Sequence, residues 1–194
     1  MRPMTPSGPT QDRPRSEGRA VDDAYLNEWA EHFRAPLATT ELADASAVAF
    51  RVGAEWLALP TPMLLRVAPH VVPHRVPHRT ARALRGIVNV GGQLVPCVAL
   101  ADLLDIDADG GSARAGRHTF ARLLLVQWED HAYALPVADL HGIVRYASAR
   151  VQAPAATINK GVQRYLAGVL AEGDLRIGLL DAALLGPQLA RTLR

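Results

Sequence analysis

The sequence lacks the features that mark secreted and membrane-spanning proteins. It contains a single cysteine, Cys97, so no disulfide can form within the chain, which fits a reducing compartment. The longest apolar run, residues 94–101, contains Pro96 and is far too short to cross a bilayer. No apolar signal segment follows Met1. We therefore expect a cytoplasmic protein that does not insert into a membrane.

Recognised catalytic and nucleic-acid-binding patterns are missing as well. The formal net charge is only +2 and the arginines are scattered, so no basic surface for nucleic acid is indicated. No glycine-rich phosphate loop lies between a strand and a helix, no serine has the context of a nucleophile, and the acids are not paired. Cys97 lies in an apolar run, which predicts a buried and inert thiol. We expect neither catalysis nor a bound cofactor.

One series of histidines resembles a metal site, and its spacing decides whether the side chains could bind one metal ion. His70, His74 and His78 recur every four residues among prolines, which favour an extended backbone. On an extended strand, residues four apart share a face but lie about 13 Å apart. Ligands of one zinc ion must all bind at about 2.0–2.1 Å, so this spacing predicts no metal site. A histidine-based, metal-dependent enzyme is the less favoured alternative, and metal analysis of the purified protein distinguishes the two.

The first part of the chain differs in composition from the rest. Residues 1–20 are rich in Pro, Gly, Ser and Arg and hold almost no apolar residues, which predicts a disordered tail. Tyr25, Trp29 and Phe33 recur at helical spacing, which predicts an amphipathic helix over residues 21–38. The apolar stripe of this helix packs either on the body of the protein or on a partner, and the sequence leaves both open.

The remaining chain, residues 46–185, reads as one β-rich unit that occurs twice. Apolar residues alternate with polar ones in short runs, as in β-strands. Residues 55–60 and 131–136 both end in Leu-Pro, and residues 83–88 align with 165–170 with a glycine at the same place. The order of these elements repeats with few insertions, which indicates an internal duplication.

The repeated unit predicts a mainly β fold with about five short strands per copy. No strand–helix–strand connection within a copy is long enough for parallel pairing, so we expect two antiparallel barrels that each end in a short helix. The first barrel should cover about residues 47–106 and the second about residues 120–185. Grooves and strand edges beside such barrels suit helical or extended partners, which favours a binding protein.

The hairpin region of the first copy, residues 84–100, carries a family resemblance. It resembles the signature of CheW-type coupling proteins, whose glycine, asparagine, hairpin glycine, proline and closing leucine align in order with Gly86, Asn89, Gly92, Pro96 and Leu100. The resemblance extends over both copies. It implies two five-stranded SH3-like barrels (a CheW-like domain) and a non-catalytic role.

Similarity to this family also implies partners. A CheW-type protein joins the cytoplasmic tip of a methyl-accepting chemotaxis receptor to the regulatory domain of a CheA-type histidine kinase, in arrays at the membrane. By this resemblance the first barrel meets the kinase, and the groove between the barrels takes the receptor helix. A kinase-binding decoy or regulator with the same fold is an alternative, which a kinase assay with and without receptor distinguishes.

The sequence departs from the family pattern at three positions of the first copy, and one of these is Ala99, where the family usually has Asp before the strand-ending Leu. The arginine that precedes the hairpin glycine in the family is Gly91 here, and the acid usual after the first apolar turn is Val67. Both family residues tune partner contacts, so these changes indicate a changed partner set. We expect a coupling protein of an accessory, Wsp-like chemosensory system.

The candidate partner contacts follow from the resemblance and from position in the repeat. In the first copy they include apolar residues and the hairpin, and in the second copy they include the two apolar counterparts: Leu64, Leu65, Val67, Val88, Asn89, Gly91, Gly92, Leu140 and Ile143. Asn89, Gly91 and Gly92 are expected to shape the hairpin, because positive φ angles favour glycine. Core packing is the competing interpretation of the apolar residues, above all of Val88 and Ile143.

Overall fold

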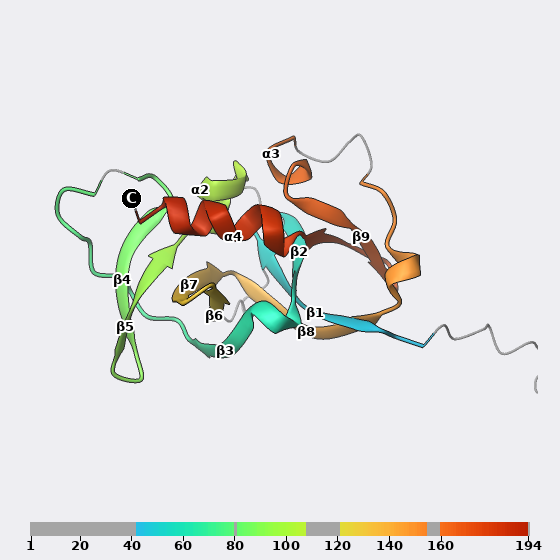
Figure 1. Ribbon diagram of the computed structural model, residues 1–194, viewed down its shortest axis with the longest axis horizontal. Helices are drawn as coiled ribbons and strands as arrows, with labels where there is room; N and C mark the ends of the chain where they lie inside the picture. The colour runs from blue at the N-terminus through green and yellow to red at the C-terminus, as the bar shows by residue number, and fades with distance from the viewer. Residues whose placement is uncertain (1–41, 80, 108–120, 155–159, 194) are drawn as a thin grey trace, which may run out of the picture. The chain divides into compact units, whose positions relative to one another are not determined.

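Two five-stranded β-sheets make up most of the described chain (Figure 1), and the predicted mainly β fold is thereby confirmed. The computed structural model describes residues 42–79, 81–107, 121–154 and 160–193. The predicted tail 1–20 and the predicted helix 21–38 lie outside the described residues. The elements, in chain order, are β1 (Ala45–Val52), β2 (Glu55–Pro60), η1 (Thr61–Met63), β3 (Leu64–Pro69), β4 (Leu84–Val90), β5 (Gln93–Val98), α2 (Leu100–Leu104), β6 (Arg122–Trp128), β7 (His131–Val137), β8 (Asp139–Tyr146), η3 (Ser148–Arg150), α3 (Lys160–Gln163), β9 (Leu166–Glu172), β10 (Leu175–Leu180) and α4 (Ala182–Arg191).

The two sheets have the same strand order when the two copies are exchanged. One sheet, here called sheet A, runs β8-β1-β2-β10-β9, and the other, sheet B, runs β3-β6-β7-β5-β4. The copies correspond as β1 to β6, β2 to β7, β3 to β8, β4 to β9 and β5 to β10. Each sheet therefore combines the first two strands of one copy with the last three strands of the other copy.

The mixing of strands from both copies in each sheet contradicts the expectation that each barrel is a contiguous piece of chain. Residues 47–106 and 120–185 do not form separate sheets, because β2 pairs in parallel with β10 and β5 pairs in parallel with β7. Parallel neighbours need a long connection. Within one copy no such connection exists, but most of the chain separates β2 from β10. The all-antiparallel expectation fails at these two pairs for the same reason.

Four β-bulges fall at equivalent positions of the two copies. The pairing register skips Leu65 in β3 and His141 in β8. It also skips Arg85 in β4 and Ala167 in β9. A bulge leaves one residue unpaired and turns its side chain in a new direction. The alignment of the two copies predicts these same pairs of residues as counterparts, so the structure supports the duplication residue by residue.

Glycines inside β4 and β9 allow a second segment to lie against each strand. His74 and Ile87 exchange backbone hydrogen bonds of 2.8 Å, and Gln152 and Val169 exchange equivalent bonds of 3.0 and 2.8 Å. A Cβ atom at Gly86, which has φ +138°, would lie only 2.1 Å from the carbonyl oxygen of His74. Only glycine fits this close approach, so Gly86 fixes the path of the proline-rich segment across β4.

The core has one shared part and one part for each sheet. The largest cluster combines side chains of both sheets with α2 and α4, including Phe50, Leu57, Tyr133 and Leu185. Two smaller clusters each belong to a single sheet, and their members occupy equivalent positions, such as Cys97 in sheet B and Leu179 in sheet A. The shared cluster therefore holds the two sheets together.

Cys97 is fully buried within sheet B. Burial raises the pKa of the Cys97 thiol to about 11, although the positive charge of Arg85 acts in the opposite direction. Because the thiolate is the nucleophilic form, this thiol is neutral and unreactive at neutral pH.

The close approach at Gly86 predicts a large cost of substitution. Gly92→Ala places a side chain at positive φ in open space and should lower the free energy of unfolding by about 1–3 kcal/mol. Gly86→Ala should cost about 1–3 kcal/mol more, because the backbone must also move away from His74. Urea unfolding followed by tryptophan fluorescence measures both, and equal losses would contradict the proposed role of the close contact.

The buried thiol predicts a second outcome. Native protein at pH 8 should not react with a maleimide over an hour, whereas protein in concentrated guanidinium should be labelled at one site per chain. Mass spectrometry detects the mass that the maleimide adds to the chain. Rapid labelling of the native protein would show that Cys97 is accessible or that its sheet opens easily.

Candidate partner-binding surface

Strand β3 forms one outer edge of sheet B and carries two of the predicted contact residues on its exposed side. Among the described strands it pairs only with β6. The bulge turns Leu65 outward, and the side chains of Leu65 and Val67 are 50% and 40% exposed. Leu64 lies half-buried against the shared core. An edge strand with exposed apolar side chains and unpaired backbone groups is suited to binding another polypeptide.

Strand β8 is the counterpart of β3 and forms the outer edge of sheet A. Ile143, the equivalent of Val67, is 62% exposed. Leu140, the equivalent of Leu64, is likewise half-buried against the shared core. The bulged residue His141 lies edge-on to the ring of Trp56, with 5.9 Å between the ring centroids. The core-packing interpretation therefore fails for Ile143.

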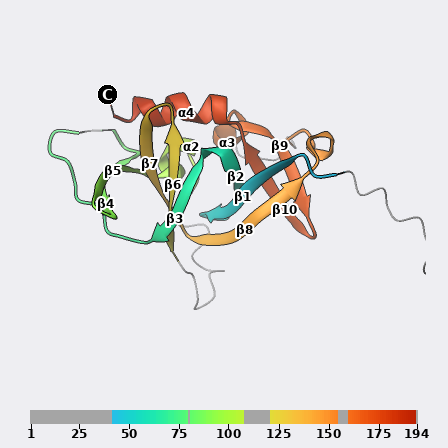
Figure 2. The ribbon, with the colours of Figure 1, turned by 60° about the horizontal axis from the view of Figure 1, so that its bottom comes forward.

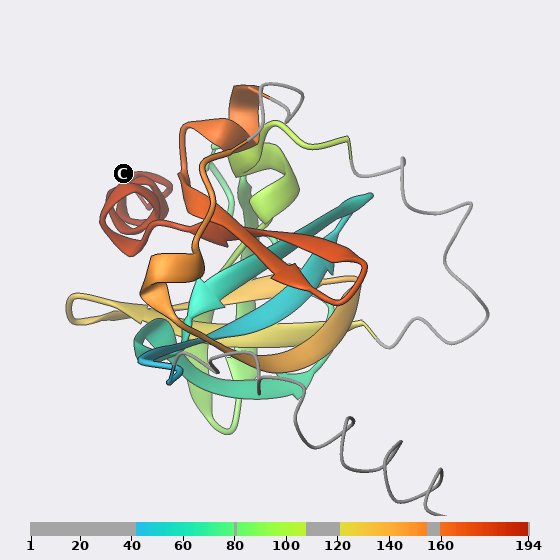
Figure 3. The ribbon, with the colours of Figure 1, turned by 90° about the vertical axis from the view of Figure 1, so that its right-hand side faces the viewer.

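The two edge strands lie on the same side of the described unit. Figure 2 shows β3 and β8 near one another, and Figures 1 and 3 both place them away from α4. We use the name edge surface for Leu65 and Val67 of β3 together with Ile143 of β8. The sequence predicted these three residues as contacts but could not predict that they occupy equivalent edges of two different sheets.

The β4–β5 hairpin has the conformation that its sequence predicts. Gly91 and Gly92 have φ angles of 63° and 86°, as the two central residues of a type I′ turn require. The backbone N–H of Gly92 donates a hydrogen bond of 2.9 Å to Oδ1 of Asn89. Asn89, Gly91 and Gly92 thus shape an exposed hairpin. Their contact with a partner stays a prediction.

An arginine from another strand lies at this hairpin. Nη2 of Arg66, in β3, donates a hydrogen bond of 2.9 Å to the carbonyl oxygen of Val90. A Cβ atom at Gly91 would lie 3.1 Å from the same nitrogen. A guanidinium group therefore stands beside the position where the family pattern has its arginine. Sequence reasoning missed Arg66, because nothing along the chain shows that β3 reaches the tip of the β4–β5 hairpin.

Val88 is not part of this surface, and the prediction of a partner contact there is wrong. Its side chain is fully buried in the cluster of sheet B. Along β4 the side chains of Val88 and Val90 face inward, whereas Asn89 between them is exposed. This alternation follows from the two-residue period of a strand, and it places Val88 on the inner face.

The histidine series does not converge. His70, His74 and His78 are exposed along the segment that crosses β4. Within residues 42–79, 81–107, 121–154 and 160–193, no group of three His, Cys, Asp or Glu side chains could hold a metal ion. None of the helices in this part of the chain combines the length and the apolar character needed to cross a membrane.

Comparison with known proteins places the chain in a family. A structural match covers 71% of this chain and 84% of the scaffolding protein TtCheW from Thermoanaerobacter tengcongensis, with a TM-score of 0.59 and 18% sequence identity, which shows a common fold. No match is found among curated protein sequences. The family model described as CheW-like domain matches residues 46–187. Because that match spans the two sheets and most of the sequence, this chain belongs to the CheW-like domain family.

Proposed function

We propose that this protein is a non-catalytic adaptor that couples a methyl-accepting chemotaxis receptor to a CheA-type histidine kinase. Membership in the CheW-like family supports the general class of chemotaxis scaffold. The observation that carries the finer proposal is the edge surface, because β3 and β8 present exposed apolar side chains on equivalent edges of two sheets. A coupling protein has to hold two partners at once, and two separate edges provide for this.

The edge of sheet B is the better candidate for the kinase. The family resemblance assigns the kinase to the first barrel, and three of the five strands of the first copy, β3, β4 and β5, belong to sheet B. The kinase regulatory domain is itself CheW-like, so it offers sheet edges of the same kind. Leu65 and Val67 would supply the apolar contact, and the unpaired backbone groups of β3 would supply hydrogen bonds.

The edge of sheet A is the better candidate for the receptor. Ile143 is exposed to 62% and stands on β8, on the same side of the unit as β3. A receptor tip is helical, and a helix binds by placing apolar side chains of one face against an apolar surface. A helix lying along β8 would reach Ile143 and leave the outer edge of β3 to the kinase.

Two of the residues that depart from the family pattern lie on or beside this surface. Val67 is exposed on β3, and Gly91 lies at the hairpin next to the guanidinium group of Arg66. Replacing an acid by valine removes a charge from the surface and adds apolar area. These differences support a partner set distinct from that of flagellar steering, as in an accessory, Wsp-like chemosensory system.

Substitutions on the two edges should separate the two partners. Leu65→Asp should weaken binding of the purified kinase regulatory domain by about tenfold or more, or about 1.4 kcal/mol, because a charge enters an apolar contact. Ile143→Asp should weaken binding of a receptor cytoplasmic fragment to the same degree. Leu184→Asp is the matched control, since Leu184 is 45% exposed but lies on α4. Biolayer interferometry measures all three, and losses equal to those of the control would contradict the assignment.

A reconstituted assay should distinguish the adaptor from a kinase-binding decoy. With receptor, kinase and this protein together, kinase autophosphorylation should rise well above the rate for kinase and receptor alone. The rise should disappear with either Leu65→Asp or Ile143→Asp. Binding to the kinase without any rise in the presence of receptor would identify a decoy, and binding to neither partner would reject the proposal.

A further inference from the structure

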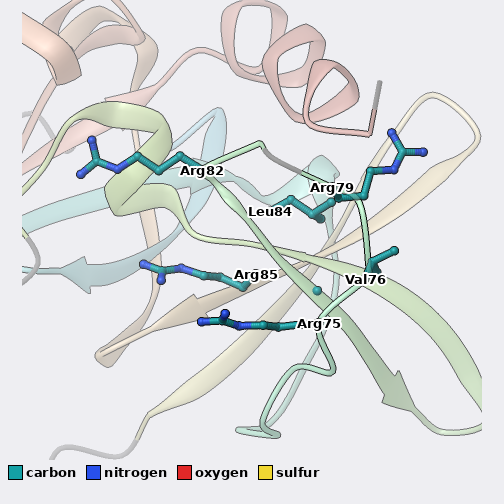
Figure 4. A pocket seen from close by; sticks show the side chains of 7 residues that line it. Arg75, Val76, Arg79, Arg82, Leu84 and Arg85 are labelled. Atoms are coloured by element: carbon teal, nitrogen blue, oxygen red, sulfur yellow. The ribbon is translucent and has the colours of Figure 1, made fainter.

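A hollow at the start of β4 is lined by arginines that the coupling role does not use. Its volume is about 220 Å³, and Arg75, Arg79, Arg82 and Arg85 line it together with Val76, Leu84 and Gly86. Figure 4 shows Arg75 and Arg85 side by side and parallel, whereas Arg79 points away from them. Nη1 of Arg79 donates a hydrogen bond of 2.6 Å to the carbonyl oxygen of Leu193.

Two local features of the fold bring these side chains together. The paired hydrogen bonds between His74 and Ile87 place Arg75 across from Gly86. Because Gly86 has no side chain, the backbone at Arg75 can lie close to β4. The bulge in β4 leaves Arg85 unpaired and exposed on the same edge. Residues ten apart in the sequence thus become neighbours, with their guanidinium groups turned the same way.

The carboxylate of Asp102 pairs with two of these arginines. Oδ1 of Asp102 lies 3.1 Å from Nε of Arg82, and Oδ2 of Asp102 lies 2.8 Å from Nη2 of Arg85. The Asp102 side chain is only 12% exposed, and its two ion pairs hold the guanidinium groups of Arg82 and Arg85. Arg75 has no acidic partner within the described ranges. Three guanidinium groups against one carboxylate leave an excess of two positive charges.

The second copy shows that the fold does not require this arrangement. Backbone bonds from Ala99 to Ala83 and from Asp181 to Tyr165 fix the equivalent positions. The counterparts of Arg75, Arg82, Arg85 and Asp102 are therefore Ala153, Arg164, Ala167 and Leu184. Arg164 instead lies over the ring of Tyr165, 5.1 Å from its centroid. The same scaffold is built without the charged set, so the set is not there to hold β4 in place.

An apolar hollow adjoins the basic one. It has a volume of about 290 Å³ and shares Val76, Arg79 and Leu84 with the basic hollow. Its remaining lining is Ile87, Leu94, Pro96 and Leu193. Leu94 in this lining is 73% exposed. The combined depression has a cationic end and an apolar end.

We propose that this depression binds a nucleotide, with its phosphate groups at Arg75 and Arg85 and its base against the apolar end. Planar guanidinium groups bind phosphate oxygens through pairs of parallel hydrogen bonds. A phosphate group carries nearly two negative charges at neutral pH and matches the local excess, whereas a carboxylate carries only one. The apolar side chains around Leu94 provide a surface for a flat aromatic ring. This inference does not depend on the proposed coupling function.

Calorimetric titration of the full chain with pyrophosphate and with ATP tests the phosphate end. Pyrophosphate should bind with a Kd of about 1 mM or lower at low salt, corresponding to about −4 kcal/mol. Arg75→Ala should weaken this binding at least tenfold. Because Arg75 forms no ion pair with any described residue, this variant should fold normally. Arg164→Ala, which changes the equivalent of Arg82 in the second copy, is the matched control and should bind like the unaltered protein.

The same titration separates a nucleotide from other phosphate-bearing ligands. ATP should bind several-fold more tightly than pyrophosphate, and Leu94→Ser should abolish that difference while leaving pyrophosphate binding unchanged. If a phosphoserine peptide binds more tightly than ATP, the ligand of this depression is a phosphorylated protein segment and not a nucleotide. Absence of binding at 10 mM pyrophosphate and ATP, or an equal loss in the Arg75 and Arg164 variants, would overturn the proposal.

Discussion

The parallel pairing of β2 with β10 and of β5 with β7 is the constraint on which the rest of the structure depends. These pairs join the two copies into sheets that neither copy can complete alone. They also bury one cluster of side chains from both sheets, including Phe50 and Tyr133. A chain built in this way cannot unfold one half and keep the other. The outer strands β3 and β8 therefore belong to one cooperatively packed unit.

The copies share a backbone and differ in the side chains that reach the surface. The bulges, the close approaches at Gly86 and Gly168 and the hydrogen bonds at Ala99 and Asp181 are the same in both. At the exposed bulge of β4, by contrast, Arg85 stands where β9 has Ala167. Such differences allow one scaffold to present distinct surfaces, because an exposed bulged residue can change at little cost in stability.

Much of the local structure was predictable from the sequence, and the misses have specific causes. The hairpin at Gly91 and Gly92 and the burial of Cys97 follow from turn chemistry and from an apolar run. The prediction of a partner contact at Val88 is wrong, because the alternation along β4 turns this side chain inward. Arg66 was overlooked because its role arises from a contact with Val90, 24 residues away in the sequence.

The sequence by itself determined that the chain is mainly β, that it contains one unit twice, and that it carries the CheW-like signature at Asn89 to Leu100. These properties are encoded in neighbouring residues through alternation, turns and glycine positions. Only the tertiary structure decided that the copies exchange strands, that Leu65 and Ile143 lie on equivalent edges, and that Arg75 lies beside Arg85. Strand partners are chosen by burial over the whole chain, and no local pattern records which distant strand completes a sheet.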